Sequence, residues 1–280
     1  MTTRLKNYQI WDWLALILLI FFAFLWLIPF YVMLRNSLST DAQITSLDWV
    51  IWPNPMQFGN FKELFADPFV PMANGFKVSA IITTFTTCFQ ILFALMAGYA
   101  LARIPYRWSN LVFILIIGTM MMPSDALFVP SYAVIARLGM VNTFPGLIMP
   151  GLFSAFNTFM FRQHFLDFPR ELEDAGTVDG LNWFGTFRHI ALPNSWAIII
   201  ALGSLTLIGS WNAFLWPLVV GQTRDWWTVQ VNLSTYMTAQ VIQLSMIFAG
   251  AVVGALPMVI LFFFLQRFIS VGVARSGIKG

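Results

Sequence analysis

Six stretches of this chain carry no charged side chain, and their length decides what the chain can fold into. They lie at about 13–34, 78–102, 109–124, 141–161, 196–219 and 244–265. A charged residue at the centre of a bilayer costs on the order of 3 kcal/mol, and about 20 apolar residues cross the hydrocarbon core. With 59% of its residues hydrophobic and 10% charged, the chain has too few polar side chains to cover a water-soluble globule. The sequence therefore predicts an all-α membrane protein with six transmembrane helices in a single domain, residues 1–280.

The first and third stretches have ends that constrain the topology. The first exceeds the apolar core of a signal peptide, about 7–15 residues, so we expect it to remain as a membrane anchor. The third is interrupted at Met122-Pro123-Ser124-Asp125, because proline disfavours a helical conformation in the residue before it. We expect residues 126–135 to form a separate short helix at the external interface, with Asp125 solvated near its start.

The distribution of basic residues predicts the orientation in the membrane. Ten of the 15 Lys and Arg residues fall on the side of the two termini, namely Arg4, Lys6, Arg103, Arg107, Arg162, Arg170, Arg188, Arg267, Arg275 and Lys279. Five fall on the opposite side, namely Arg35, Lys62, Lys77, Arg137 and Arg224. Because basic residues are in excess on the cytoplasmic side of membrane proteins, both termini are predicted to be cytoplasmic. The 35–77 loop is then external, and its residues 60–65 form a short amphipathic segment.

The chain lacks the groups that several classes of function require. Ion-coupled carriers usually place carboxylates or broken helices at the membrane midplane, and no such relay is visible in the spans. Cys88 is the single cysteine, and His164 and His189 flank one cytoplasmic loop, so neither a metal site nor catalytic residues are predicted. A phosphate loop ending in Gly-Lys-Ser/Thr is missing, so another subunit must hydrolyse any ATP that is used. The net charge of +3 is too small to indicate a nucleic-acid partner.

Polar side chains inside the spans are neutral and gather in three of them: Thr83, Thr84, Thr86, Thr87 and Gln90; Asn157 and Thr158; Ser204, Thr206, Ser210 and Asn212. Hydroxyls and amides beside Phe and Trp suit an uncharged, hydroxyl-rich solute. The competing interpretation is that they bond their own backbone or a neighbouring helix. We predict that Asn157, Trp211 and Asn212 face the bundle interior and line a pathway, because an amide on a lipid-facing surface is costly.

The loop at about 167–193 has a pattern that predicts two short helices. Asp167 is expected to cap the first helix, and Pro169 suits an early helical position. Gly180 is expected to end that helix with a positive φ, and Asn182 to cap the second. Acidic residues are unusually frequent here, which favours a protein partner over anionic lipid: Asp167, Glu171, Glu173, Asp174 and Asp179.

The residues of this loop resemble a known motif. The segment Pro169-Arg-Glu-Leu-Glu-Asp-Ala-Gly-Thr-Val-Asp-Gly180, with Phe187 and Leu192-Pro193 after it, resembles the EAA loop of permease subunits in bacterial ABC importers. Further similarities cover nearly the whole chain and point to the carbohydrate branch, similar to the second permease subunits for maltose-type oligosaccharides and for glycerol-3-phosphate. They are Tyr99-Ala-Leu-Ala-Arg103, Trp211-Asn212 with Trp216-Pro217-Leu218, and Gln266-Arg267-Phe268 with Lys279-Gly280. Where the family usually has Glu-Ala-Ala, this chain has Asp174-Ala175-Gly176, and glycine costs a helix about 1 kcal/mol relative to alanine.

This resemblance implies the type I permease fold of ABC importers, in the bacterial cytoplasmic (inner) membrane. It implies a non-enzymatic subunit that carries a sugar, an oligosaccharide or a polyol-type solute. The implied partners are a second permease subunit, an ATPase dimer that binds ATP and Mg, and an extracytoplasmic solute-binding protein. The implied ATPase-coupling residues are Glu171, Glu173, Asp174, Ala175, Gly176, Asp179 and Gly180. The alternative is a stand-alone secondary carrier of a neutral solute.

Overall fold

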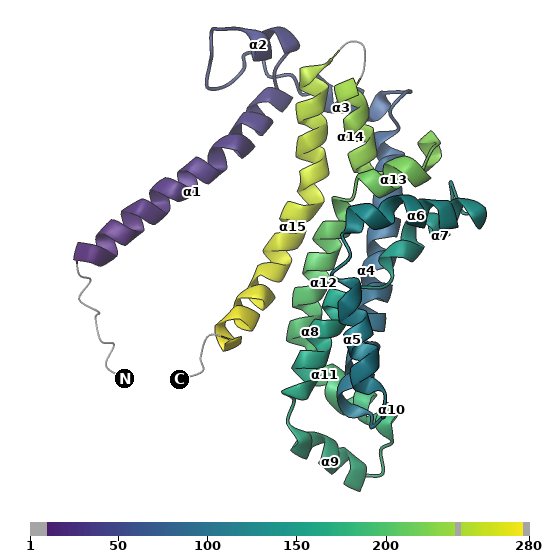
Figure 1. Cartoon of the computed structure of the whole chain (residues 1–280). Coiled ribbons are helices and arrows are strands. Elements are labelled where there is room, and N and C mark those ends of the chain that lie inside the picture. Colours follow the sequence, from purple (N-terminus) through teal and green to yellow (C-terminus); the bar gives the residue numbers. More distant parts are fainter. Residues whose placement is uncertain (1–9, 239–241, 277–280) are drawn as a thin grey trace. The chain divides into compact units, whose positions relative to one another are not determined.

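The structure is a computed structural model that describes residues 10–238 and 242–276, and in these residues the regular secondary structure is helical (Figure 1). Within this part of the chain three helices are long and apolar enough to cross a membrane: α1 (Ile10–Ser37), α4 (Met72–Arg103) and α15 (Leu244–Ser276). Three bent helix pairs raise the number to six if each pair is one span. The prediction of an all-helical protein with six candidate spans is therefore confirmed for the described residues.

The chain divides into two compact units. Unit 1 comprises the residues up to Asp67 together with Leu233–Ala255, and unit 2 comprises Pro68–Asn232 and the residues from Leu256 onward. Helix α14 (Val229–Thr238) and α15 both cross from one unit to the other. That the units act as a single domain stays a prediction.

In unit 1 the C-terminal end of α1 is anchored by polar contacts, whereas the helix itself exposes its apolar side chains. The buried side chain of Arg35 donates hydrogen bonds to the Val50 carbonyl (3.3 Å) and to Asn36 Oδ1 (2.8 Å). Asn60, in α3 (Gly59–Ala66), donates to the carbonyl groups of Ser37 and Ser39. The amphipathic segment predicted at 60–65 is thus the helix α3, and a shorter helix, α2 (Asp41–Thr45), precedes it.

The break predicted in the third stretch is confirmed. Helix α5 (Ser109–Thr119) and helix α6 (Ser124–Arg137) meet at an angle of 98°. Pro123 occupies the N-cap position of α6 with an extended conformation, as expected for a residue that ends one helix and precedes another. Asp125 is exposed in the first turn of α6, as the sequence predicted.

The fourth stretch contains a break that was not predicted from the sequence. Helix α7 (Phe144–Ile148) and the 3-10 turn η1 (Met149–Gly151) are followed by α8 (Ala155–Leu166), which is bent from them by 46°. Ser154 begins α8 as its N-cap, because its hydroxyl accepts the backbone N–H of Asn157 at 3.2 Å. The chain therefore starts a new helix where we expected one span to continue.

The fifth stretch also differs from its predicted bounds. The helix expected at about 196–219 is α12 (Trp196–Trp211), and a separate short helix, α13 (Leu215–Val220), follows it. Proline in a helix interior removes a hydrogen bond and clashes with the preceding turn, so Pro217 is accommodated in the first turn of α13 instead. The bent pair that includes α12 joins it to Trp183–Asn194 at 77°.

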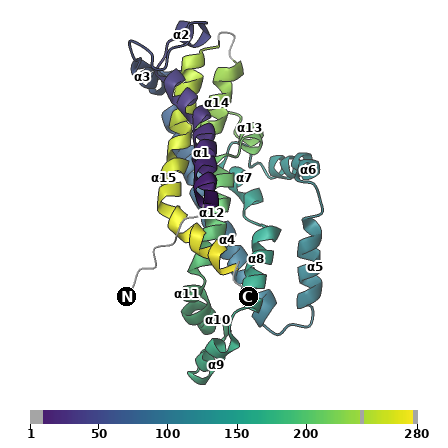
Figure 2. The same ribbon diagram turned by 90° about the vertical axis from the view of Figure 1, so that its left-hand side faces the viewer.

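Helices α4, α8 and α12 run side by side in unit 2 (Figures 1 and 2). Gly98 allows the close approach of α4 and α8, because a Cβ atom there would lie 2.6 Å from the Phe161 Cβ. The buried side chains of Leu95, Tyr99, Phe161, Phe165 and Leu202 join the three helices in one apolar core. This core fixes the position of α4, whose residues contribute both to a cavity and to contacts with the 167–193 loop.

Candidate functional site

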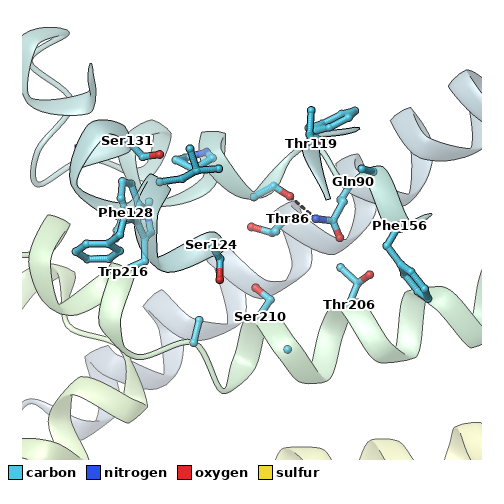
Figure 3. Close-up of a pocket in the computed structure, with 18 of the residues that line it drawn as sticks. Thr86, Gln90, Thr119, Ser124, Phe128, Ser131, Phe156, Thr206, Ser210 and Trp216 are labelled. Carbon is cyan, nitrogen blue, oxygen red and sulfur yellow. Dashed lines mark hydrogen bonds between the residues drawn. The ribbon is translucent and has the colours of Figure 1, made fainter. Parts of the chain in front are cut away.

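A cavity of about 790 Å³ lies in unit 2, lined by residues of α4, α6, α8, α12 and α13 and of the segments between them. Its polar lining consists of neutral side chains: Thr86, Gln90, Thr119, Ser124, Ser131, Thr206 and Ser210. Among the described residues that line it, none has an ionisable side chain. Figure 3 shows Thr86, Ser124 and Ser210 between the aromatic rings of Phe128 and Trp216 at one end and Phe156 at the other. Hydroxyls and aromatic rings in one cavity suit a neutral, polyhydroxylated molecule.

Gln90 is held in the cavity wall by a network of amides. Its Nε2 donates to the carbonyl of Gly151 at 2.6 Å, and its Oε1 accepts a hydrogen bond from Asn157 Nδ2 at 3.2 Å. Asn157 Nδ2 also donates to Thr206 Oγ1 at 3.0 Å. These bonds join α4, α8 and α12 at one level, so the side chains of Gln90 and Thr206 have fixed positions in the wall.

The three predicted pathway residues are not in the lining. Asn157 is buried behind the wall, with 4% of its surface exposed, and supports Gln90 and Thr206. Trp211 is buried against the ring of Phe76. Asn212 is exposed and accepts a hydrogen bond from Gln230 Nε2 at 3.2 Å.

The lining residues contributed by α4 and α12 were visible in the sequence as neutral polar groups. Four of the neutral polar side chains within the predicted spans line the cavity: Thr86, Gln90, Thr206 and Ser210. Thr119, Ser124 and Ser131 were missed, because they reach the cavity only through the 98° bend between α5 and α6. The polar character of the second and fifth stretches was the available signal for this lining. That Asn157, Trp211 and Asn212 take part in a pathway stays a prediction.

The 167–193 loop contains two helical segments, as predicted. The first is α9 (Arg170–Val178), and the second runs through α10 (Trp183–Thr186), the π turn η2 (Phe187–Ala191) and α11 (Leu192–Asn194). Gly180 has φ of 82°, and the Asn182 side chain accepts the Gly185 N–H at 2.8 Å, which confirms both predicted turn residues. Asp167 does not cap α9. It ends α8 instead, and Pro169 precedes α9 without a side-chain cap.

Helix α9 has a buried face and an exposed face. Glu173 and Gly176 are buried. A Cβ atom on Gly176 would lie 2.4 Å from the Ile190 Cδ1, so glycine at this position allows the two segments of the loop to pack. The other predicted coupling residues are exposed: Glu171, Asp174, Ala175, Asp179 and Gly180. Only this second group is available to a partner.

Glu173 pairs with Arg103, the last residue of α4. The Arg103 Nε lies 3.2 Å from the Glu173 Oε2, as an ion pair rather than an aligned hydrogen bond. Burial raises the pKa of the Glu173 carboxyl, while the Arg103 guanidinium and the nearby Tyr99 hydroxyl act in the opposite direction. The same guanidinium donates a hydrogen bond to the carbonyl of Phe168, just before α9. Arg103 thus contacts both the residue segment that precedes α9 and the first turn of α9.

A metal site does not emerge from the geometry. Within residues 10–238 and 242–276, no group of three or more His, Cys, Asp or Glu side chains could hold a metal ion. His164 bonds to the hydroxyl of Ser195 at 3.0 Å, and His189 to the carbonyl of Gly185 at 3.0 Å. Both histidines therefore have structural partners within the chain. Lys279 and Gly280 of the resemblance lie outside the described residues.

Comparison with known proteins gives consistent matches. Residues 90–275 match the family described as "Binding-protein-dependent transport system inner membrane component". The chain is 32% identical over 280 residues to the arabinooligosaccharides transport system permease protein AraQ of Halalkalibacterium halodurans, covering 98% of this chain and 99% of that protein. It is 30% identical to the lactose transport system permease protein LacG of Rhizobium radiobacter, covering 88% of each. A chain from the crystal structure of a bacterial ABC transporter involved in the import of the acidic polysaccharide alginate shares the fold, with a TM-score of 0.83, 20% identity, and coverage of 95% of this chain and 99% of that chain.

Proposed function

The chain belongs to the inner membrane components of binding-protein-dependent transport systems, and on that premise we propose that it forms half of the translocation pathway of an ATP-driven sugar importer. As a transport component it is not an enzyme. Membership in a binding-protein-dependent system implies a solute-binding protein and an ATPase as partners. It argues against the alternative of a stand-alone secondary carrier.

The solute we propose is a neutral sugar or oligosaccharide. The single observation that carries this proposal is the cavity, whose polar lining is made of hydroxyls and one amide, without an ionisable group among the described lining residues. An anionic solute would be expected to meet basic side chains, because a charge transferred from water into an uncharged cavity loses its hydration. The names of AraQ and LacG, which refer to arabinooligosaccharides and lactose, support a neutral sugar.

We further propose that the exposed face of α9 is the surface that meets the ATPase. Glu171, Asp174 and Ala175 are exposed there, beside Val178, whose surface is 88% exposed. In this arrangement the ATPase subunits bind ATP and Mg. The 167–193 loop and both termini lie in the cytoplasm. A second permease subunit forms the other half of the pathway. The ATPase shifts the permease between inward-facing and outward-facing states by binding the two states with different affinity.

The uptake of labelled solutes tests the proposed function. Cells that express the chain with its native partner subunits are compared with cells that lack only this chain, using arabinooligosaccharides, lactose, maltose-type oligosaccharides and glycerol-3-phosphate. We expect ATP-dependent uptake of a neutral sugar that disappears without the chain. Uptake of the anionic solute alone would contradict the proposed solute class, and uptake that survives ATP depletion would contradict the proposed energy source.

A cavity variant tests the proposed pathway. In Ser210→Phe a ring would fill part of the cavity, so we expect uptake to fall at least tenfold while the complex still assembles. Leu205→Phe is the matched control, because Leu205 lies on the same helix, is 62% exposed and does not line the cavity. Equal uptake by the two variants, in assembled complexes, would contradict the assignment of this cavity.

A further inference from the structure

The ion pair between Arg103 and Glu173 joins two elements that are 70 positions apart in the chain and that have different tasks in the proposed function. Arg103 ends α4, which lines the cavity, and Glu173 lies in the first turn of α9, which carries the exposed coupling surface. Both side chains are largely buried, with 4% and 11% of their surfaces exposed. Figure 1 shows α9 beyond the end of the group formed by α4, α8 and α12 in unit 2.

Aromatic contacts surround this ion pair and add a second connection to the loop. The ring of Tyr99, one turn before Arg103, lies 5.1 Å from the ring of Phe187 and 5.2 Å from the ring of Phe165. Phe187 belongs to the π turn η2, and Phe165 belongs to α8. The end of α4 is therefore fixed to both helical segments of the loop and to α8.

A buried ion pair contributes little net stability, because the attraction between the charges is offset by their desolvation. Its effect is on geometry, since displacing one partner leaves the other charge buried and uncompensated. A small movement of α9 alone would break the pair, whereas a movement of α9 together with α4 would preserve it. The buried pair thus favours joint movement over separate movement.

Helix α4 extends this connection to the cavity. Gln90 and Arg103 are on the same uninterrupted helix, about 20 Å apart at 1.5 Å of rise per residue. Gln90 lies in the cavity wall, where it bonds to Gly151 and Asn157. A displacement of the Arg103 end is therefore transmitted along a rigid element to the residues that line the cavity.

We propose that Arg103 and Glu173 are positioning residues that make α9 and α4 move as one body, so that a movement imposed on the exposed face of α9 opens or closes the cavity. The inference rests on the proposed function, because it explains how a movement of the exposed face of α9 is transmitted to the cavity. Glu173 then acts within this chain, while Glu171 and Asp174 face the partner.

Charge reversal and charge exchange test this role in the complete importer, reconstituted in proteoliposomes with its native partner subunits. In Arg103→Glu and in Glu173→Arg we expect ATP hydrolysis to continue while solute uptake per ATP falls at least tenfold. The exchanged double variant Arg103→Glu/Glu173→Arg restores the attraction and is expected to return uptake per ATP to within about threefold of the original protein. Arg188→Glu, an exposed charge reversal in the same loop, is the control. Normal coupling in the single variants, or a double variant that assembles without recovering, would overturn the proposal.

A covalent link provides a test that does not depend on reversed charges. In a Cys88→Ala background, the pair Arg103→Cys/Glu173→Cys is expected to be uncoupled, and a short reversible thiol cross-linker between the two cysteines is expected to restore uptake per ATP. Reduction of the linker should abolish uptake again. If linking the two positions leaves the importer inactive, α9 moves relative to α4 during transport and the proposal fails. Failure of the proposed function is a separate result, because the unmodified complex would then import no sugar.

Discussion

At the scale of single residues, the structure separates side chains that line the cavity or are exposed on α9 from buried side chains that contact them. Asn157 supports the cavity wall through Gln90 and Thr206, and Glu173 pairs with Arg103. Asn157 was predicted to line a pathway because an amide that faces lipid is costly, and Glu173 was implied to be a coupling residue by the resemblance to the EAA loop. Both are buried against neighbouring side chains, whereas Thr86 and Ser210 line the cavity.

Asn157→Ala should destabilise the protein rather than change its solute. The substitution removes the buried amide that donates to both Gln90 and Thr206, and the net loss of a hydrogen bond costs about 0.5–1.5 kcal/mol. Thermal unfolding of the purified complex in detergent should show a lower midpoint. Asn212→Ala is the control, since Asn212 is exposed. Unchanged unfolding of the Asn157 variant, combined with an altered solute preference, would instead make Asn157 a pathway residue.

Arg103→Gln should make the packing of α9 against the C-terminal end of α4, here called docking, depend on pH. Burial already raises the pKa of Glu173, and removal of the guanidinium that opposes this effect raises it further. The pKa of Glu173 is higher when α9 is docked than when α9 is free. Docking is therefore strongest when the pH is below the ordinary pKa of a Glu carboxyl, near 4.5, and weakens as the pH rises through the pKa of the docked state. The other groups facing Glu173, namely Tyr99, Arg170 and Asp174, are the same in the variant.

Hydrogen–deuterium exchange measures this effect. After correction for intrinsic exchange, the amides of α9 in Arg103→Gln should lose protection as the pH rises above about 4.5, the ordinary pKa of a Glu carboxyl. The double variant Arg103→Gln/Glu173→Gln has no titrating carboxyl at this position and should show a flat profile. Greater protection at the higher pH in the single variant would contradict the sign of the pKa shift.

At the scale of elements, the helix breaks create the cavity and one long helix connects it with the loop. The bend of 98° between α5 and α6 brings Thr119, Ser124 and Ser131 to the wall, and the break before α8 brings the apolar residues Phe153 and Phe156 there. Helix α4, in contrast, is continuous from Met72 to Arg103. Its packing against α8 depends on glycine at a position where the two backbones approach closely.

Gly98→Ala should weaken the packing of α4 against α8. The added methyl group would lie 2.6 Å from the Phe161 Cβ and 2.8 Å from the Arg162 backbone nitrogen, and neither atom can move without moving α8. Overpacking of this kind costs about 1–3 kcal/mol, and it should appear as a lower midpoint of thermal unfolding. Gly118→Ala on α5 is the matched control, because nothing lies within 4 Å of its added methyl group. Equal stability of the two variants would show that α8 adapts to the extra volume.

At the scale of the whole molecule, the protein is a multi-pass inner membrane permease whose proposed activity requires partner chains. Three long helices and three bent pairs supply up to six spans within the described residues. The apolar side chains of α1 are exposed in the isolated chain, as expected of a surface that faces lipid or a second permease subunit. The orientation of the termini stays a prediction from the ten-to-five distribution of the 15 basic residues.

Cysteine labelling tests that orientation. In a Cys88→Ala background, which removes the single cysteine, Asp48→Cys should react with a membrane-impermeant reagent in intact spheroplasts. Ser276→Cys should react only after the membrane is opened. External labelling at both positions would place the C-terminal end of α15 outside the cell and contradict the predicted topology.

The sequence by itself determined the class of protein, most of the spans and two turn residues of the loop, Gly180 and Asn182. Charge-free stretches of sufficient length have few alternatives to membrane helices, and Gly180 and Asn182 act through local backbone geometry. The family likewise followed from the order of its motifs. Tertiary structure decided which polar groups face the cavity. Pro123 predicted the break between α5 and α6, but only the structure gave the 98° angle that brings Thr119, Ser124 and Ser131 to the cavity. It also decided that Glu173 faces Arg103 rather than a partner, since an ion pair between residues 70 positions apart forms only when packing brings α9 to the end of α4.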